Sequence, residues 1–214
     1  MHKIKAIDFV NEVEVYRLRS GLFNLNKFCC GKKSFDDYIK KDAFKDQEEK
    51  LGQTWLFVYK NKEIIGYVTI AMGDLNKTHH DKLRKLPHTN IPGMLLGQIA
   101  THIDYQKLGV GKWMIDWVIA QSLQLSETLG CRILLLDAEN DVVDWYVKKL
   151  HFVHISLKGK NVMFYDLRKY FMDDKNSMNK GPSKMREKTK KARVMSAIKG
   201  SQNMTRLIPI PDKK

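Results

Sequence analysis

Two closely spaced glycines lie between an apolar segment and a helical pattern, in the run Gln106-Lys107-Leu108-Gly109-Val110-Gly111-Lys112. Glycine lets a backbone approach an anion without an intervening side chain. The first N–H groups of a helix lack internal partners, and the helix dipole adds partial positive charge there. The run therefore predicts a pyrophosphate site, which Lys107 and Lys112 are near enough to assist. On the glycines alone, an ordinary tight turn is the simpler interpretation.

Other residues able to do chemistry are less specific. Asp137 and Glu139 follow an apolar segment and could act as bases through water, although solvated loop carboxylates are commoner. The pair His79-His80 lacks a third ligand at metal-site spacing, so we expect no metal. His102 alternates with apolar neighbours and is expected to be a hydrogen-bonded core residue.

The elements that must position these residues alternate between strands and helices. Strands are expected at residues 4–10, 55–59, 64–72, 94–103, 132–137, 152–157 and 162–167. Helices are expected from Ser34, where Asp37 completes an acidic capping box, and at residues 109–129 and 142–150. A loop is expected at residues 73–90, and Gly130 should end the long helix. This order predicts an α/β (mixed α+β) fold with a central mixed, mostly antiparallel sheet of about six to seven strands, flanked by helices.

Charge is unevenly distributed along the 214 residues, whose formal net charge is +14. From Asp173 onward, 12 lysines and arginines stand against 4 carboxylates, a net +8 in 42 residues. Because this part is poor in large apolar residues, we expect a folded domain at 1–172 and a basic, flexible tail at 173–214. Such a tail would attract RNA. A solvated tail without a partner and a contact with another protein are the alternatives.

Three features bear on the compartment. Cys29, Cys30 and Cys131 are odd in number and lack metal-site spacing, so free thiols in a reducing compartment are expected. No apolar run approaches the ~18 residues of a membrane span. The N-terminus lacks the apolar centre of a secretion signal. We expect a cytoplasmic protein without membrane contact.

Gln106 stands three residues ahead of Gly109, and Gly111 follows, after an apolar strand and before an amphipathic helix. This resembles the Gln/Arg-x-x-Gly-x-Gly/Ala signature of the GNAT acetyltransferase superfamily, and the expected element order is similar to that superfamily's. The resemblance covers about residues 1–170. It implies a GNAT fold and transfer of an acetyl group from acetyl-CoA, without a metal, to a primary amine.

The resemblance also implies where the cofactor binds. Its pantetheine arm would follow the backbone of the strand before the glycines, between two splayed parallel strands. The implied cofactor-binding residues are Ile99, Ala100, Thr101, Gln106, Lys107, Leu108, Gly109, Val110, Gly111, Lys112 and Asn140. An ordinary core strand is the alternative for the strand residues, and helix capping is the alternative for Asn140.

Many members place a tyrosine on the helix after the fifth main strand, where its hydroxyl serves the departing thiolate. The common pattern runs from asparagine seven residues to tyrosine and five more to phenylalanine. Counting from Asn140 or back from Phe152 lands on Val147, and His151 replaces the customary glycine. Aligning the aromatic pair instead selects Tyr146, with one residue removed before it and one added after. We favour Tyr146 as the catalytic acid, because valine has no proton to give. A core or surface tyrosine is the alternative.

Two segments carry a narrower resemblance, namely Phe28-Cys29-Cys30-Gly31-Lys32-Lys33-Ser34-Phe35-Asp36-Asp37-Tyr38-Ile39 and Pro92-Gly93-Met94-Leu95-Leu96-Gly97-Gln98-Ile99-Ala100. They are similar to motifs of a GNAT branch that includes toxins acetylating aminoacyl-tRNA, except that Gln98 replaces an arginine. The branch implies an aminoacyl-tRNA acceptor, with a protein amine second, and its members often form homodimers. Nearby lysines suit a nucleic-acid substrate: Lys27, Lys32, Lys33, Lys40 and Lys41. The alternative function is a non-catalytic GNAT-fold module that binds RNA or protein through the basic tail.

Overall fold

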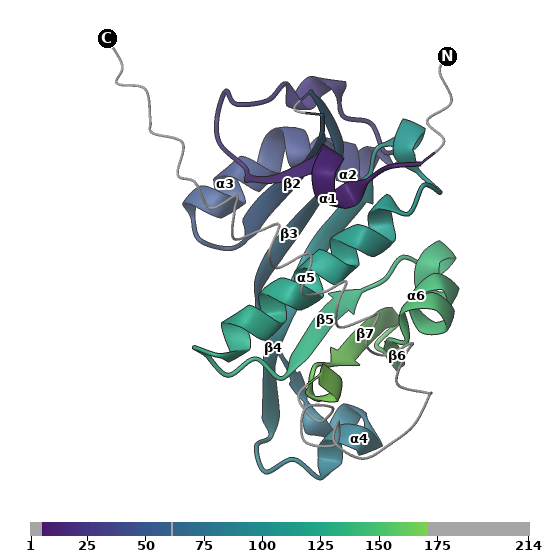
Figure 1. Cartoon of the computed structure of the whole chain (residues 1–214). Coiled ribbons are helices and arrows are strands. Elements are labelled where there is room, and N and C mark those ends of the chain that lie inside the picture. Colours follow the sequence, from purple (N-terminus) through teal and green to yellow (C-terminus); the bar gives the residue numbers. More distant parts are fainter. Residues whose placement is uncertain (1–5, 61, 171–214) are drawn as a thin grey trace.

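The computed structural model describes residues 6–60 and 62–170, so the tail expected at 173–214 lies outside the described residues. One sheet of seven strands runs in the order β1-β2-β3-β4-β5-β7-β6 (Figure 1). Every neighbouring pair is antiparallel except β4 and β5, which are parallel. The expected mixed, mostly antiparallel sheet is confirmed. The strands are β1 (Val13–Arg17), β2 (Gln53–Tyr59), β3 (Glu63–Asn76), β4 (Asn90–Thr101), β5 (Ile133–Asp137), β6 (Val153–Leu157) and β7 (Lys160–Asp166).

Helices cover both faces of this sheet. Short 3-10 turns are η1 (Leu25–Lys27), η3 (Lys77–His79), η4 (Ile103–Tyr105) and η5 (Asn140–Val142). The other helices are α1 (Phe9–Glu12), α2 (Lys33–Asp37), the π-helix η2 (Tyr38–Asp42), α3 (Ala43–Glu48), α4 (Asp81–Arg84), α5 (Val110–Ser126) and α6 (Val143–Leu150). None of the helices within the described residues is both long and apolar enough to span a bilayer.

The core is divided between the two faces. Helices α5 and α6 lie on one face (Figure 1). They share a single hydrophobic cluster with strands from both halves of the sheet, and Met114 and Tyr146 belong to it. The opposite face holds two separate clusters. One contains Ile39 of η2 and Tyr67 of β3, and the other contains Leu83 of α4. On one face, the long helix α5 therefore packs across both halves of the sheet, whereas on the opposite face the hydrophobic core forms two separate clusters.

The division coincides with a splay between β4 and β5. These strands pair over only four positions, from Gly93 with Ile133 to Leu96 with Leu136. Beyond them, the pairing of β4 with β3 shifts register at Gly97, which forms a β-bulge. Strand β4 then continues along β3 to Thr101 while β5 ends at Asp137. One edge of the last part of β4 is therefore left without a neighbouring strand among the described residues.

The first strand is the clearest error of the sequence analysis. Residues 6–10 do not form it, because the Asp8 carboxylate accepts hydrogen bonds from the N–H groups of Val10 and Asn11 and caps helix α1. Ile4 and Lys5 lie outside the described residues. The strand begins at Val13, three residues beyond the predicted end.

Three boundaries also differ. Ser34 is not a helix cap: α2 begins at Lys33, and Asp36 accepts the N–H of Cys30 at 2.7 Å. The expected loop at 73–90 instead contains the end of β3, η3 and α4. Gly130 does not end the long helix, which stops at Ser126 with Glu127 in a right-handed conformation. The two hairpins and helices α5 and α6 are confirmed.

Candidate active site

The turn between β4 and α5 has the backbone geometry of an anion site. Gly109 adopts φ +91° directly before the helix, and Lys107 is also left-handed at φ +63°. No side chain caps α5, and its first turn contains no acidic residue. The first N–H groups of the helix therefore remain open to a ligand, and no carboxylate opposes a negative charge.

Gln106 fixes this turn in place. Its side-chain amide donates to the carbonyl oxygens of Cys30 at 2.8 Å and Thr101 at 3.2 Å. The N–H of Ile103 also donates to the carbonyl of Cys29 at 2.8 Å. The 28–33 loop is thus attached to the turn, and Gln106 orients the backbone instead of projecting towards a ligand.

The two lysines of the turn differ. Lys112 forms an ion pair with Asp116 one helical turn later, which offsets its charge. Lys107 is exposed and has no ion pair with a described residue. The side chains of Leu108 and Val110 pack into the core, so these two residues can offer a ligand only their main chain.

The last residues of β4 present backbone to the splay. Ile99, Ala100 and Thr101 pair with β3 along one edge, whereas the other edge faces the opening left by β5. Ile99 packs on the α5 face and Ala100 lies in the opposite cluster. A ligand arm between the strands would therefore meet main-chain donors and acceptors.

Tyr146 lies in the core beside this opening. It is 4% exposed, and its ring meets Trp145 and Phe152 edge-on, with centroids 4.9 and 5.4 Å away. Burial raises the pKa of its phenol well above the ordinary value. Its hydroxyl makes no hydrogen bond with a described residue, whereas Val147 is 36% exposed.

The backbone around Tyr146 accommodates the unusual spacing from Asn140 to Tyr146 and from Tyr146 to Phe152. Before it, η5 is a tight 3-10 turn, and after it the carbonyl of Tyr146 accepts from the N–H groups of His151 and Phe152. These donors lie five and six residues ahead instead of the usual four, so the helix end widens. His151 takes φ +63°, the left-handed conformation for which glycine is customary.

Helix α6 and the start of α5 face each other across the splay. A Cβ atom placed on Gly111 would lie 3.7 Å from both the Trp145 ring and the Thr101 hydroxyl oxygen. The structure thus brings together the end of β4, the glycine turn and the aromatic pair of α6. These segments are far apart in sequence and meet at one opening.

Asn140 does not cap a helix, because Glu139 precedes η5 and Val142 precedes α6. Instead, its side-chain oxygen accepts from the Nδ2 of Asn161 at 2.6 Å. Asn161 also donates to the carbonyl of Ala138 at 3.2 Å. Asn161 could not be predicted from the sequence, since nothing in the pattern of β7 marks a residue that supports a loop elsewhere.

The other polar candidates from the sequence make structural contacts and form no cluster that suggests chemistry within the described residues. His102 accepts the N–H of Asp104 and lies near the carbonyl of Lys27, but it is half-buried at the start of η4 and is not the core residue expected. Asp137 lies 3.8 Å from Lys160. The cysteines are free, and burial raises the pKa of the Cys30 thiol to about 11. No cluster of metal ligands occurs among residues 6–60 and 62–170.

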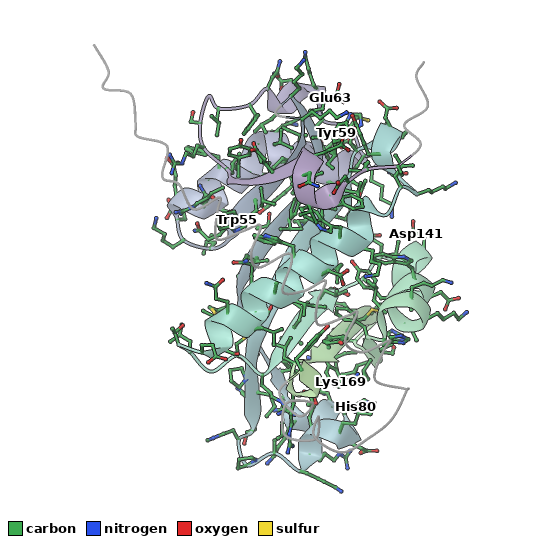
Figure 2. The ribbon with its side chains drawn as sticks, in the orientation of Figure 1. Trp55, Tyr59, Glu63, His80, Asp141 and Lys169 are labelled. Carbon is green, nitrogen blue, oxygen red and sulfur yellow. The ribbon has the colours of Figure 1, made fainter. Side chains whose placement is uncertain are left out.

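A cavity of about 780 Å³ lies elsewhere, between the C-terminal half of α5 and the first strands. Trp55, Trp117 and Met72 line it. Figure 2 shows Trp55 and Asp141, which follows Asn140, on opposite sides of α5. None of the residues of the glycine turn lines this cavity, so it is separate from the opening at the splay.

Residues 15–152 match the Acetyltransferase (GNAT) family. This chain belongs to the GNAT family. It is an acetyltransferase that uses acetyl-CoA as co-substrate. The uncapped start of α5 suits the pyrophosphate, and the open edge of β4 suits the pantetheine arm, so the described residues fit this GNAT co-substrate.

Similar proteins lie in the branch that the sequence resembles. A tRNA-acetylating toxin of Mycobacterium tuberculosis is 24% identical over 121 residues, which cover 55% of this GNAT chain and 71% of that protein. A tyrosine-to-phenylalanine mutant of KacT has a TM-score of 0.69 at 17% identity, covering 75% of this chain and 98% of that one. AtaT complexed with acetyl-methionyl-tRNAfMet has a TM-score of 0.69 at 18% identity, with the same coverage. The resemblance to the toxin branch is confirmed.

Proposed function

We propose that this GNAT protein transfers the acetyl group of acetyl-CoA to the amino group of an aminoacyl-tRNA. The observation that carries the proposal is the attachment of the basic 28–33 loop to the glycine turn through Gln106. This attachment would set the lysines of the segment beside the opening proposed for the thioester. A protein amine is the second candidate acceptor.

The charge near the opening supports an RNA substrate. Lys27 and Lys33 are exposed, Lys40 is half-buried, and none of the three forms an ion pair with a described residue. Lys32 and Lys41 are paired with Asp141 and Asp37. Lysines that form no close ion pair favour the phosphate backbone of a nucleic acid over a small neutral metabolite. The relatives known as tRNA-acetylating toxin and AtaT point the same way.

The chemistry would depend on few side chains. Acetyl-CoA supplies a thioester that a neutral amine can attack directly. Tyr146 would hold a proton at its hydroxyl and give it to the sulfur as the carbon–sulfur bond breaks. An ordinary phenol is already protonated at neutral pH, and burial, which raises the pKa of Tyr146 further, leaves that proton in place. The attacking nitrogen would lose its proton to water, and Asp137 or Glu139, which follow the core of β5, could accept that proton in turn.

The cofactor would be held mainly by main chain. We assign the pantetheine arm to Ile99–Thr101 and the pyrophosphate to residues 106–112. Asn140 would contribute its amide, oriented by Asn161. The wide end of α6 supports Tyr146 over Val147, because it supplies the extra residue that this alignment requires after the tyrosine.

An acceptor assay tests the proposal. Full-length protein and labelled acetyl-CoA are incubated with charged tRNA, deacylated tRNA and a lysine-containing peptide. We expect label on charged tRNA alone, at the amino acid. Label on the peptide but not on charged tRNA would overturn the acceptor assignment and leave the acetyltransferase activity intact.

We also propose that the tail at 173–214 strengthens RNA binding by its charge. Replacing its lysines with glutamine should weaken tRNA binding and flatten the dependence of affinity on salt concentration. Unchanged salt dependence would contradict this role.

A further inference from the structure

Polar contacts surround the open end of the splay between β4 and β5. On the β4 side, Gln106 and Ile103 hold the 28–33 loop through the carbonyls of Cys30 and Cys29, each at 2.8 Å. The N–H of Cys30 is held in turn by Asp36. This loop is therefore fixed to the turn that follows β4.

The β5 side is fixed separately by Asn161. Its main-chain carbonyl accepts the N–H of Ala138 at 3.0 Å, and its side chain holds the Ala138 carbonyl and the Asn140 amide. His154 lies 3.0 Å from the Asn161 side-chain oxygen and completes the contacts. The loop that leads from β5 into α6 is thus held by the β6–β7 hairpin.

Within the part of the chain that the structure describes, one ion pair joins the two sides. Lys32 Nζ lies 2.9 Å from Asp141 Oδ1, although the residues are 109 positions apart. Asp141 directly follows Asn140, and Lys32 lies two residues after Cys30. Both side chains are exposed, at 44% and 61%, so the pair is weak and easily opened. The remaining contacts in this series involve main-chain or amide groups.

We propose that Lys32 and Asp141 are positioning residues that close the splay over the pantetheine arm and slow its release. This inference rests on the proposed course of the arm along β4. The pair converts an opening between two strands into a ring of backbone and side chains. A cofactor beneath it would leave only after the pair separates, whereas the chemical step at Tyr146 would not depend on it.

Release of coenzyme A from the full-length protein tests this role. Dissociation is followed by tryptophan fluorescence in a stopped-flow instrument, since Trp145 lies against Gly111. Lys32→Gln and Asp141→Asn should each raise the dissociation rate about two- to fivefold, the range for an exposed pair. The charge swap Lys32→Asp with Asp141→Lys should restore the parent rate. High salt should abolish the difference between parent and single variants.

The α6 pair between Lys148 and Asp144, which is 2.7 Å apart and more exposed at 68% and 78%, provides the control. Lys148→Gln should leave the dissociation rate unchanged. If the swap fails, and Asp141→Asn tightens binding while Lys32→Gln weakens it, Lys32 is a direct phosphate contact and the positioning role is wrong. Variants that release coenzyme A at the parent rate would also overturn it, without touching the proposed function. A parent that shows no calorimetric binding of coenzyme A would overturn both.

Discussion

At the scale of single residues, the site depends on groups whose partners are distant in sequence. Tyr146 stays a prediction: it was preferred over Val147 from the sequence because valine has no proton to donate. Asn161 and the pair of Lys32 with Asp141 could not, because each acts on a segment that only the fold brings near. Local sequence patterns predict the helix or strand in which a residue lies, but they do not predict contacts between residues that are distant in sequence.

Removal of the Tyr146 hydroxyl should affect chemistry more than binding. We expect Tyr146→Phe to lower kcat roughly 100-fold, the usual contribution of a general acid, with little change in the KM for acetyl-CoA. Tyr165→Phe is the control, since that phenol is also buried but contacts Tyr170. If Val147→Tyr restored activity to Tyr146→Phe, the acid would belong at position 147.

The raised pKa of Tyr146 also fixes a pH dependence. A phenol whose pKa lies well above its ordinary value of 10 stays protonated throughout neutral and mildly alkaline solution. The rate of acetyl transfer should therefore rise with pH as the acceptor amine loses its proton, without a fall before pH 10. A decline between pH 7 and 9 in single-turnover measurements would contradict Tyr146 as the acid.

At the scale of elements, the sequence predicted the long helices and hairpins well, because each carries many periodic positions. The errors lie in short elements with few periodic positions, namely α1, η3 and α4. Residues 4–10 are apolar enough for a strand, yet one carboxylate, that of Asp8, supplies the cap that starts a helix. Gly130 lies beyond a helix that had already ended in ordinary right-handed geometry.

The left-handed Gly109 should not tolerate a side chain. Gly109→Ala places a Cβ at φ +91°, which costs about 1–2 kcal/mol and disturbs the turn. We expect a lower midpoint of urea unfolding and weaker coenzyme A binding by calorimetry. Gly111→Ala is the control, because its Cβ would meet only ordinary contacts at 3.7 Å. Equal behaviour of the two variants would argue against a strained turn.

Gly93 controls the junction of β4 with β5. A Cβ there would lie 2.3 Å from the carbonyl oxygen of Ile133, too close for the strands to keep their spacing. Gly93→Ala should lower the free energy of unfolding by about 1–3 kcal/mol, as in overpacked cores. Gly97→Ala, whose nearest neighbour is 3.7 Å away, should have little effect on urea unfolding. If Gly93→Ala left the free energy of unfolding unchanged, β4 and β5 would be able to move apart enough to accept the added methyl group.

At the scale of the whole molecule, buried phenols set an alkaline limit to stability. Burial raises the pKa of Tyr16 to about 12 and moves those of Tyr67, Tyr105 and Tyr170 upward too. The unfolded chain ionises its tyrosines near pH 10, so stability is fully present below that pH and is lost as pH rises above it. Urea unfolding at pH 8, 10 and 11 should show this decline, and a constant midpoint would contradict it.

The divided core has a mechanical consequence. On one face, the clusters under α2–α3 and under α4 do not merge, and the strands between them share only four paired positions. The two halves of the sheet are therefore joined only by that short β4–β5 junction and by α5, which packs across both. Warming should let the two halves rotate relative to each other before either loses its own strands. An acceptor that contacts both halves would hold them at a fixed angle.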